Sequence, residues 1–173
     1  MFLNDHVILV DANDEAQGTM EKIEAHQKGE LHRAFSIFVI NSKNELLLQK
    51  RSPQKYHSGG KWTNACCSHP RENETLEEAA HRRLQEEMGF DCEIDFLFSF
   101  IYKSELDNAF IEHELDHVFI GKYDGKPTLN SEEASDWKFE SLANIEKSIA
   151  KKPDSFSVWF KMALPRVKKH LSL

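Results

Sequence analysis

The chain has 173 residues, with 22 Lys and Arg against 29 Asp and Glu, and a formal net charge of −7 at neutral pH. A length and a 40% hydrophobic content of this kind predict a single domain, residues 1–173, with one sizeable core. The negative charge argues against general affinity for nucleic acid or anionic membranes, and no apolar run reaches the roughly 20 residues that a membrane span needs. Any anionic ligand must therefore be held locally, by a metal or by a few basic side chains.

Three cysteines are present, and two of them, Cys66 and Cys67, are adjacent. This is a poor framework for disulfides and is typical of a reducing compartment. The first residues, 1–5, lack the charged start and apolar core of a signal peptide. We expect a cytoplasmic protein with neither a nucleic acid nor a membrane as partner.

Strands are predicted through the first part of the chain. The short β-branched segment 6–10 is followed by turn-forming residues at 11–14. Segments 35–40 and 46–49 are two further predicted strands, and the residues 41–45 between them are typical of a hairpin.

A helix is predicted over 74–88, because Leu76, Ala80, Leu84 and Met88 repeat every four residues and Gly89 follows as a C-terminal cap. After it, aromatic and β-branched residues predict strands, and the end of the chain predicts two helices, the second of them kinked or divided at Pro165. These later segments are strands at 92–102, 112–123 and 137–139 and helices at 142–151 and 156–170. The layout predicts a mixed α/β (α+β) sandwich built on a mixed sheet with helices packed against it.

The predicted helix carries a motif. Ser68, Glu74 and residues 82–90 together resemble the Nudix box of enzymes that act on diphosphates with a divalent metal. The box opens with Gly where this chain has Ser68, and it has Glu where this chain has Arg83. Losing a carboxylate removes an oxygen ligand for Mg²⁺, which argues against diphosphate hydrolysis by the usual route. Taken alone, the helix is as typical of a solvated surface helix with ion pairs worth about 0.2 to 0.5 kcal/mol each.

Two pairs outside the helix suggest chemistry, because side chains two apart in a strand share a face. Cys67 and His69 form one pair, a thiol beside a possible metal ligand, although Cys67 could equally be a small buried apolar residue. Glu112 and Glu114 form the other, and two such carboxylates repel unless a cation or a proton lies between them. An exposed strand face is the alternative interpretation for the second pair.

Histidines at 26 and 32 would complete a mixed nitrogen and oxygen site with His69 and the two carboxylates. Such a site suits Mn²⁺ or Zn²⁺. The other histidines are interpreted as isolated surface residues; they include His57, His81, His113, His117 and His170.

In chain order, six segments are similar to the successive motifs of the type 1 isopentenyl diphosphate isomerases, which have a Nudix-like fold. The segments are 21–26, 31–32, 49–51, 62–70, 82–89 and 112–114. The resemblance runs from about Asp5 to the C-terminal helix. It implies an enzyme of isoprenoid biosynthesis that interconverts isopentenyl diphosphate and dimethylallyl diphosphate by metal-dependent protonation and deprotonation, as a monomer or a homodimer.

The resemblance also implies the roles of individual residues. Cys67 and Glu114 would be the catalytic acid and base, facing each other across the substrate. A divalent metal, Mn²⁺, Zn²⁺ or Mg²⁺, would be held by His26, His32, His69, Glu112 and Glu114. A Mg²⁺ ion would bridge Glu87 and the diphosphate. The substrate would contact Lys22, Arg51, Lys55, Arg83, Tyr102 and Trp159.

Other hypotheses stay open. A Nudix hydrolase or a non-catalytic metal- or diphosphate-binding module could share this scaffold, because fold does not fix function. Trp62 and Cys66 are interpreted as structural, and the polar segments 104–108 and 131–136 as solvated surface.

Overall fold

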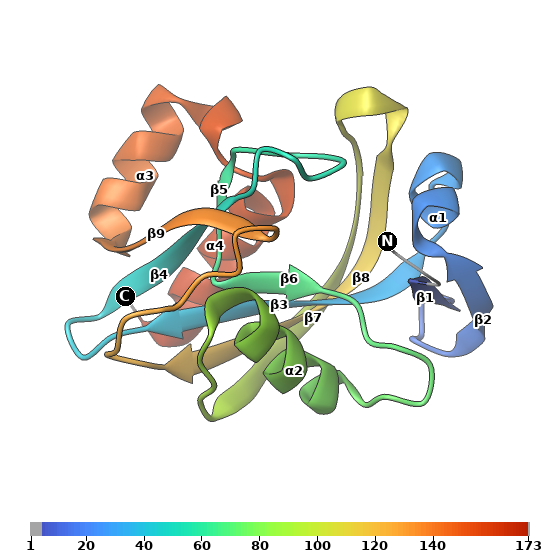
Figure 1. Cartoon of the computed structure of the whole chain (residues 1–173), viewed down its shortest axis with the longest axis horizontal. Coiled ribbons are helices and arrows are strands. Elements are labelled where there is room, and N and C mark those ends of the chain that lie inside the picture. The colour runs from blue at the N-terminus through green and yellow to red at the C-terminus, as the bar shows by residue number, and fades with distance from the viewer. Residues whose placement is uncertain (1–4, 173) are drawn as a thin grey trace.

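The computed structural model describes residues 5–172, which form a mixed sheet with helices on both faces (Figure 1). The strands are β1 (His6–Val10), β2 (Ala16–Glu21), β3 (His32–Ile40), β4 (Glu45–Arg51), β5 (Trp62–Thr63), β6 (Cys66–Ser68), β7 (Ile94–Glu105), β8 (Ile111–Lys122) and β9 (Ala134–Ser141). The α-helices are α1 (Lys22–Lys28), α2 (Leu76–Met88), α3 (Leu142–Lys151) and α4 (Val158–Leu171), with short 3-10 turns at Asp107–Ala109 and Pro153–Ser155. None of these helices combines the length and the apolar composition that crossing a membrane requires.

Strand β3 is the centre of the sheet. Along one edge it pairs in parallel with β8 over its whole length, from His32 opposite Glu114 to Ile40 opposite Lys122. Along the other edge it pairs in turn with β1, β6 and β4, all antiparallel. Strand β7 continues the sheet beyond β8, and β5 and β9 flank β4. Several segments distant in sequence therefore meet on one strand.

The two faces of the sheet carry separate apolar cores, because side chains alternate along each strand. Phe38 and Val118 lie in the core that includes Phe160 of α4. Phe35 lies in the core that includes Leu84 of α2. In Figure 1, α2 lies in front of the long strands and α4 behind them.

The predicted fold class is confirmed: the chain is a mixed sheet with helices packed on both faces. The first predicted strand coincides with β1, and the predicted helix of residues 74–88 is α2. Thr75 and Glu78 form a reciprocal capping box at its start, and Gly89 ends it in the left-handed conformation.

The sequence-based prediction missed four short elements and was partly wrong about the effect of Pro165 on the last helix. Strands β2, β5 and β6 and helix α1 were not predicted, because they are short and, in the case of β2, largely exposed. Pro165 was predicted to kink or divide the last helix, and it does not divide it, because α4 runs on through Pro165. Proline removes one backbone hydrogen bond, and the buried side chains on either side, such as Phe160 and Val167, hold the helix against the core.

A stability test follows from the end of α2. Gly89 has φ 69°, and a Cβ there would lie 2.3 Å from the carbonyl oxygen of Thr128. Gly60 has φ 73° with open space around its Cβ position, so it is a matched control. We expect Gly60→Ala to lower the free energy of unfolding by about 1 to 2 kcal/mol, the left-handed penalty alone. Gly89→Ala should cost about 3 kcal/mol or more, because backbone must also move. Urea denaturation measures both, and equal losses would contradict the close approach.

Candidate active site

One pocket is lined by side chains from strands β4, β6 and β8, from helices α1, α2 and α4, and from neighbouring loops. It is lined by Lys22, Arg51, Lys55, Tyr56, His57, Cys67, Ser68, His69, Arg83, Glu87, Glu112, Glu114 and Trp159. Three further residues singled out in the sequence, His26, His32 and Tyr102, are buried and contact the carboxylates of the lining. The structure thus brings every predicted site residue into one region.

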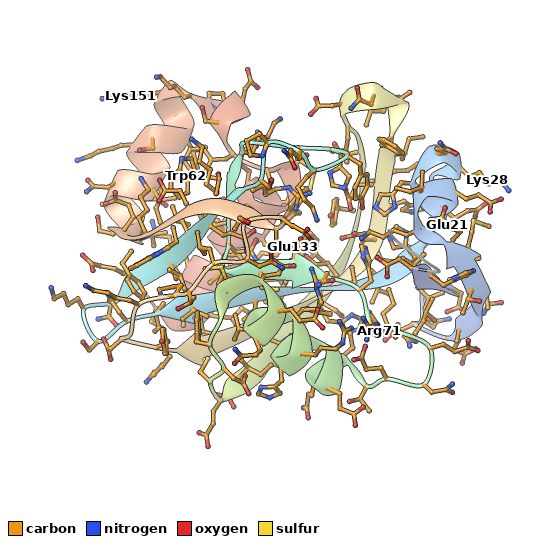
Figure 2. All side chains as sticks on the ribbon, in the orientation of Figure 1. Glu21, Lys28, Trp62, Arg71, Glu133 and Lys151 are labelled. Atoms are coloured by element: carbon orange, nitrogen blue, oxygen red, sulfur yellow. The ribbon has the colours of Figure 1, made fainter. Side chains whose placement is uncertain are left out.

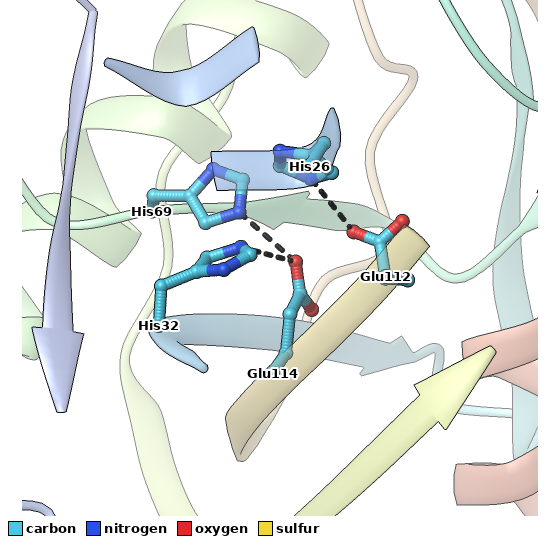
Figure 3. Close-up of side chains that lie close together, drawn as sticks. All are labelled: His26, His32, His69, Glu112 and Glu114. Atoms are coloured by element: carbon cyan, nitrogen blue, oxygen red, sulfur yellow. Dashed lines mark hydrogen bonds and ion pairs between the residues drawn. The ribbon is translucent and has the colours of Figure 1, made fainter. Parts of the chain in front are cut away.

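Five potential metal ligands form a compact cluster at this pocket (Figure 3). Each offers one nitrogen or oxygen atom, and these atoms all lie within 4.8 Å of one another; the residues are His26, His32, His69, Glu112 and Glu114. The His26 Nε2 atom lies 3.2 Å from Glu112 Oε1, and the His69 Nε2 atom lies 2.9 Å from Glu114 Oε1. His32 Nε2 lies 3.5 Å from the same Glu114 oxygen.

Backbone carbonyls orient two of these rings. His26 Nδ1 lies 2.7 Å from the Lys22 carbonyl oxygen, and His32 Nδ1 lies 2.8 Å from that of Glu30. An Nδ1 facing a carbonyl must carry the proton, so in a neutral ring the Nε2 lone pair points at the carboxylates. Lone pairs of nitrogen and oxygen then face each other, which is unfavourable unless a cation or a proton lies between them.

Two buried atoms of the cluster, His32 Nε2 and Glu112 Oε2, have no hydrogen-bond partner in the part of the chain that the structure describes. Buried polar atoms are normally paired, so these two indicate room for a further partner. Three imidazoles and two carboxylates make a donor set that fits a divalent ion such as Mn²⁺ or Zn²⁺. The ligand roles themselves stay predictions.

The sulfur of Cys67 is surrounded by polar groups. Its S–H lies 3.0 Å from Asn64 Oδ1, and the indole N–H of Trp159 donates to the sulfur at 2.9 Å. The Asn64 oxygen is held toward the sulfur because its amide nitrogen donates to the carbonyls of Ile37 and Cys66. Burial raises the pKa of the Cys67 thiol, so the sulfur is protonated at neutral pH.

Glu114 is also held by Tyr102, its cross-strand neighbour in β7. The Tyr102 hydroxyl donates to Glu114 Oε2 at 2.8 Å, which leaves Oε1 to the histidines. Next along the same face, Asp116 is fully buried and accepts a hydrogen bond from Ser36. Burial, followed by the charge of Glu114, raises the pKa of Asp116. Sequence reasoning missed Asp116, although its two-residue spacing from Glu114 is a signal that could have found it.

Four cationic side chains also line the pocket, and they are Lys22, Arg51, Lys55 and Arg83. The guanidinium of Arg51 lies 5.2 Å from the centre of the Trp159 ring and donates to the carbonyl of His57. Arg83 donates to Glu87 Oε1 at 2.6 Å. Within residues 5–172, the Nε atoms of both arginines are buried and have no hydrogen-bond acceptor, so two N–H donors are unsatisfied.

The interpretation of His57 and His117 as surface residues was wrong. His57 is 4% exposed, and its Nε2 lies 3.4 Å from Glu112 Oε2. Burial lowers the pKa of His57 to about 3 despite the charge of Glu112, so the ring is neutral. His117 is also buried and contacts Asp14 at 2.9 Å. His57 comes from a loop, where no periodic pattern reveals which side chains turn inward.

We expect ion binding to stabilise the fold. At a free Mn²⁺ or Zn²⁺ concentration 100 times the dissociation constant, unfolding should cost about 2.7 kcal/mol more than in chelated protein. Glu112→Gln should lose most of this gain, because it removes a carboxylate of the cluster. His81→Gln, which changes a partly exposed histidine paired with Asp91, is the control. Thermal melts with and without chelator measure the difference, and an equal gain in Glu112→Gln and His81→Gln would place the ion elsewhere.

Comparison with known proteins agrees with this geometry. Residues 30–160 match the family model of the NUDIX domain. A relative from Photorhabdus laumondii, named isopentenyl-diphosphate Delta-isomerase 2, is 54% identical over 92% of this chain and 90% of its own length. One of the same name from Aromatoleum aromaticum is 52% identical over 95% of this chain and 87% of its own length.

Two solved structures share the fold at low sequence identity. A protein of Deinococcus radiodurans superposes with a TM-score of 0.79 at 20% identity, over 94% of this chain and 98% of its own. A MutT protein of Methanosarcina mazei gives a TM-score of 0.67 at 20% identity, over 83% and 96% of the two chains.

Proposed function

Since this chain belongs to the isopentenyl-diphosphate Delta-isomerases, within the NUDIX domain family, we infer that it is the enzyme that interconverts isopentenyl diphosphate and dimethylallyl diphosphate in isoprenoid biosynthesis. One structural observation best supports this function. Cys67 and Glu114 line the same pocket as Arg51 and Arg83, whose Nε–H groups have no acceptor among the described residues. We propose that residues 1–173 form a single domain that carries this reaction.

The chemistry needs two acid/base groups. A proton is added to the terminal methylene carbon of isopentenyl diphosphate, and the branched carbon gains tertiary carbocation character. A proton then leaves the neighbouring methylene group, and its C–H electron pair forms the new double bond. We assign these transfers to Cys67 and Glu114. Because the reaction is reversible, each group is the acid in one direction and the base in the other.

Neighbouring side chains support those two roles. Tyr102 holds one oxygen of Glu114, and the Trp159 indole N–H contacts the Cys67 sulfur. The Trp159 side chain lines the pocket, and an aromatic ring face stabilises a developing cation through its quadrupole. We propose that Trp159 shields the carbocation from water and lowers its energy.

We further propose that His26, His32, His69, Glu112 and Glu114 hold a divalent metal. When bound, Mn²⁺, Zn²⁺ or Mg²⁺ there would supply positive charge that fixes the Glu114 carboxylate and lowers its affinity for a proton. The backbone contacts of His26 and His32 keep the two Nε2 atoms aimed at that site.

The diphosphate belongs beside the four cationic side chains of the pocket. We propose that Lys22, Arg51, Lys55 and Arg83 bind its oxygens, with Mg²⁺ between the diphosphate and Glu87. The unpartnered Nε–H groups of Arg51 and Arg83 support this, since a diphosphate offers the acceptors that they lack. Arg83 stands where the Nudix box has a Glu, so this position would bind the diphosphate and would not supply a carboxylate for hydrolysis.

A direct assay separates isomerase from hydrolase. The purified chain is incubated with isopentenyl diphosphate and Mg²⁺ in D₂O, and the olefinic and methyl protons are followed by NMR. We expect dimethylallyl diphosphate with incorporated deuterium, and no turnover in a chelated sample. Release of phosphate would instead favour a NUDIX hydrolase, and binding without conversion would favour a non-catalytic module.

Substitution tests the two acid/base assignments. Cys67→Ala and Glu114→Gln should each fold normally and lose turnover by roughly 10³-fold or more, because one proton transfer loses its group. Cys92→Ala, which removes a thiol that does not line the pocket, should keep the wild-type rate. Near-full activity in Cys67→Ala would show that the thiol is not the acid/base group.

A further inference from the structure

We propose that Glu133 is a positioning residue for diphosphate binding, whose carboxylate joins Lys55 and Arg83 into one clamp. Its Oε2 accepts a hydrogen bond from the Lys55 ammonium at 2.6 Å, and its Oε1 lies 3.0 Å from Arg83 Nη2. The inference rests on the proposed role of Lys55 and Arg83 as diphosphate ligands. Glu133 does not itself line the pocket, so it acts through these two side chains.

The interpretation of residues 131–136 as solvated surface was wrong for Glu133. Its side chain is 15% exposed, whereas the neighbouring Glu132 is exposed. In Figure 2, Glu133 lies toward the middle of the molecule, while Lys28 and Lys151 lie at its two ends. Glu133 is therefore half-buried and is not a solvated residue.

Backbone hydrogen bonds hold Glu133 against both elements that carry its partners. Its carbonyl accepts from the amide of Ser52, which begins the loop that contains Lys55. Its amide donates to the carbonyl of Asn130, whose own amide donates to the carbonyl of Glu87 in α2. The segment between β8 and β9 is thus tied to α2 and to the loop after β4. The Glu133 carboxylate is the group that spans the two.

Lys55 depends on this carboxylate more than Arg83 does. Arg83 is also held by Glu86 and Glu87, whereas the side-chain hydrogen bond found for Lys55 goes to Glu133. Two cations brought together in a pocket repel each other unless an anion lies between them. Without the carboxylate, we expect the Lys55 side chain to stay in the pocket beside the two arginines, with its ammonium no longer fixed in position and no longer stabilised in its charged form.

The protonation states agree with that role. Burial alone would raise the pKa of Glu133, but the charges of Lys55 and Arg83 outweigh it and hold the pKa at about 2. Burial lowers the pKa of Lys55, Glu133 opposes this, and the positive charges of Arg51 and Lys22 add to the lowering. Glu133 therefore helps to keep Lys55 charged at the pH where the diphosphate binds.

Competition between Glu133 and the diphosphate is the opposite possibility. The number of N–H donors argues against such competition. The Lys55 ammonium has three N–H donors, and Glu133 accepts from one of them. The Arg83 Nε–H has no acceptor among residues 5–172. The two cations can therefore bind phosphate oxygens while they remain paired with Glu133.

The test compares Glu133→Gln, Lys55→Gln and the double variant with wild type in steady-state isomerisation. We expect Glu133→Gln to raise KM about tenfold with little change in kcat, because a charge-assisted contact that orders the binding groups is lost. The KM ratio to wild type should grow as the pH rises above neutral, since Lys55 loses its proton earlier in the variant. Adding Glu133→Gln to Lys55→Gln should change KM by less than about twofold. Glu133→Asp, which keeps the charge, should restore part of the affinity.

A readout independent of turnover follows Lys55 itself. Acetic anhydride labels the neutral amine, and mass spectrometry of the peptide gives its labelling against pH. We expect the midpoint for Lys55 to fall by about one to two pH units in Glu133→Gln. Glu146→Gln is the matched control, because Glu146 pairs with Lys168 at an exposed site, at 2.8 Å, and should leave KM and the Lys55 midpoint unchanged.

The outcomes separate this inference from the proposed function. If Lys55→Gln raises KM but Glu133→Gln leaves KM and the labelling midpoint unchanged, or lowers KM, the positioning role is wrong and the diphosphate site stands. An unchanged KM in Lys55→Gln would instead remove Lys55 from the diphosphate site. Should Glu133→Gln fail to fold, Glu133→Ala decides, because it also removes the carboxylate: a wild-type KM and midpoint there would overturn the inference.

Discussion

The parallel pairing of β3 with β8 is the constraint on which the site depends. It sets His32 opposite Glu114 and turns both side chains to the same face. A slip of one residue in β8 would turn Glu112, Glu114 and Asp116 to the other face, toward the core that packs on α2. The long register, carried to Ile40 and Lys122, makes such a slip costly because the apolar residues of both cores would exchange faces. The catalytic geometry is therefore protected by ordinary core packing.

Burying so many polar groups at one end of a sheet opposes folding, and the structure offsets this in local ways. His26 and His32 use backbone carbonyls, Glu114 uses Tyr102, and Asp116 uses Ser36. The two polar atoms left without partners in the cluster lie where the proposed metal would be. Among the described residues, Arg51 Nε, Arg83 Nε and Asp116 Oδ1 are also buried without a partner, so the unpartnered polar atoms gather around the pocket, as expected of a binding site.

Charge is distributed in the pocket in a way that the net charge of −7 does not reveal. The site combines a cluster of histidines and carboxylates with four cationic side chains, Lys22, Arg51, Lys55 and Arg83. Trp159 joins the two, because its indole N–H contacts Cys67 and the Arg51 guanidinium lies over its ring. A substrate with a diphosphate at one end and a small hydrocarbon at the other matches this division.

The sequence by itself determined the mixed fold class, the first strand, and helix α2 with its caps. These follow from local rules: alternation along strands, a four-residue repeat, and caps within one helical turn. Alternation also suggested the pairs Cys67–His69 and Glu112–Glu114, whereas the full set of site residues was predicted from the resemblance to a known family. Only the tertiary structure decided which polar side chains turn inward from irregular segments. His57 lies in a loop and Glu133 in an acidic run, so nothing in their sequence neighbours distinguishes them from solvated residues. Their burial depends on contacts with Glu112, Lys55 and Arg83, which are distant in the chain and adjacent only after the sheet has formed.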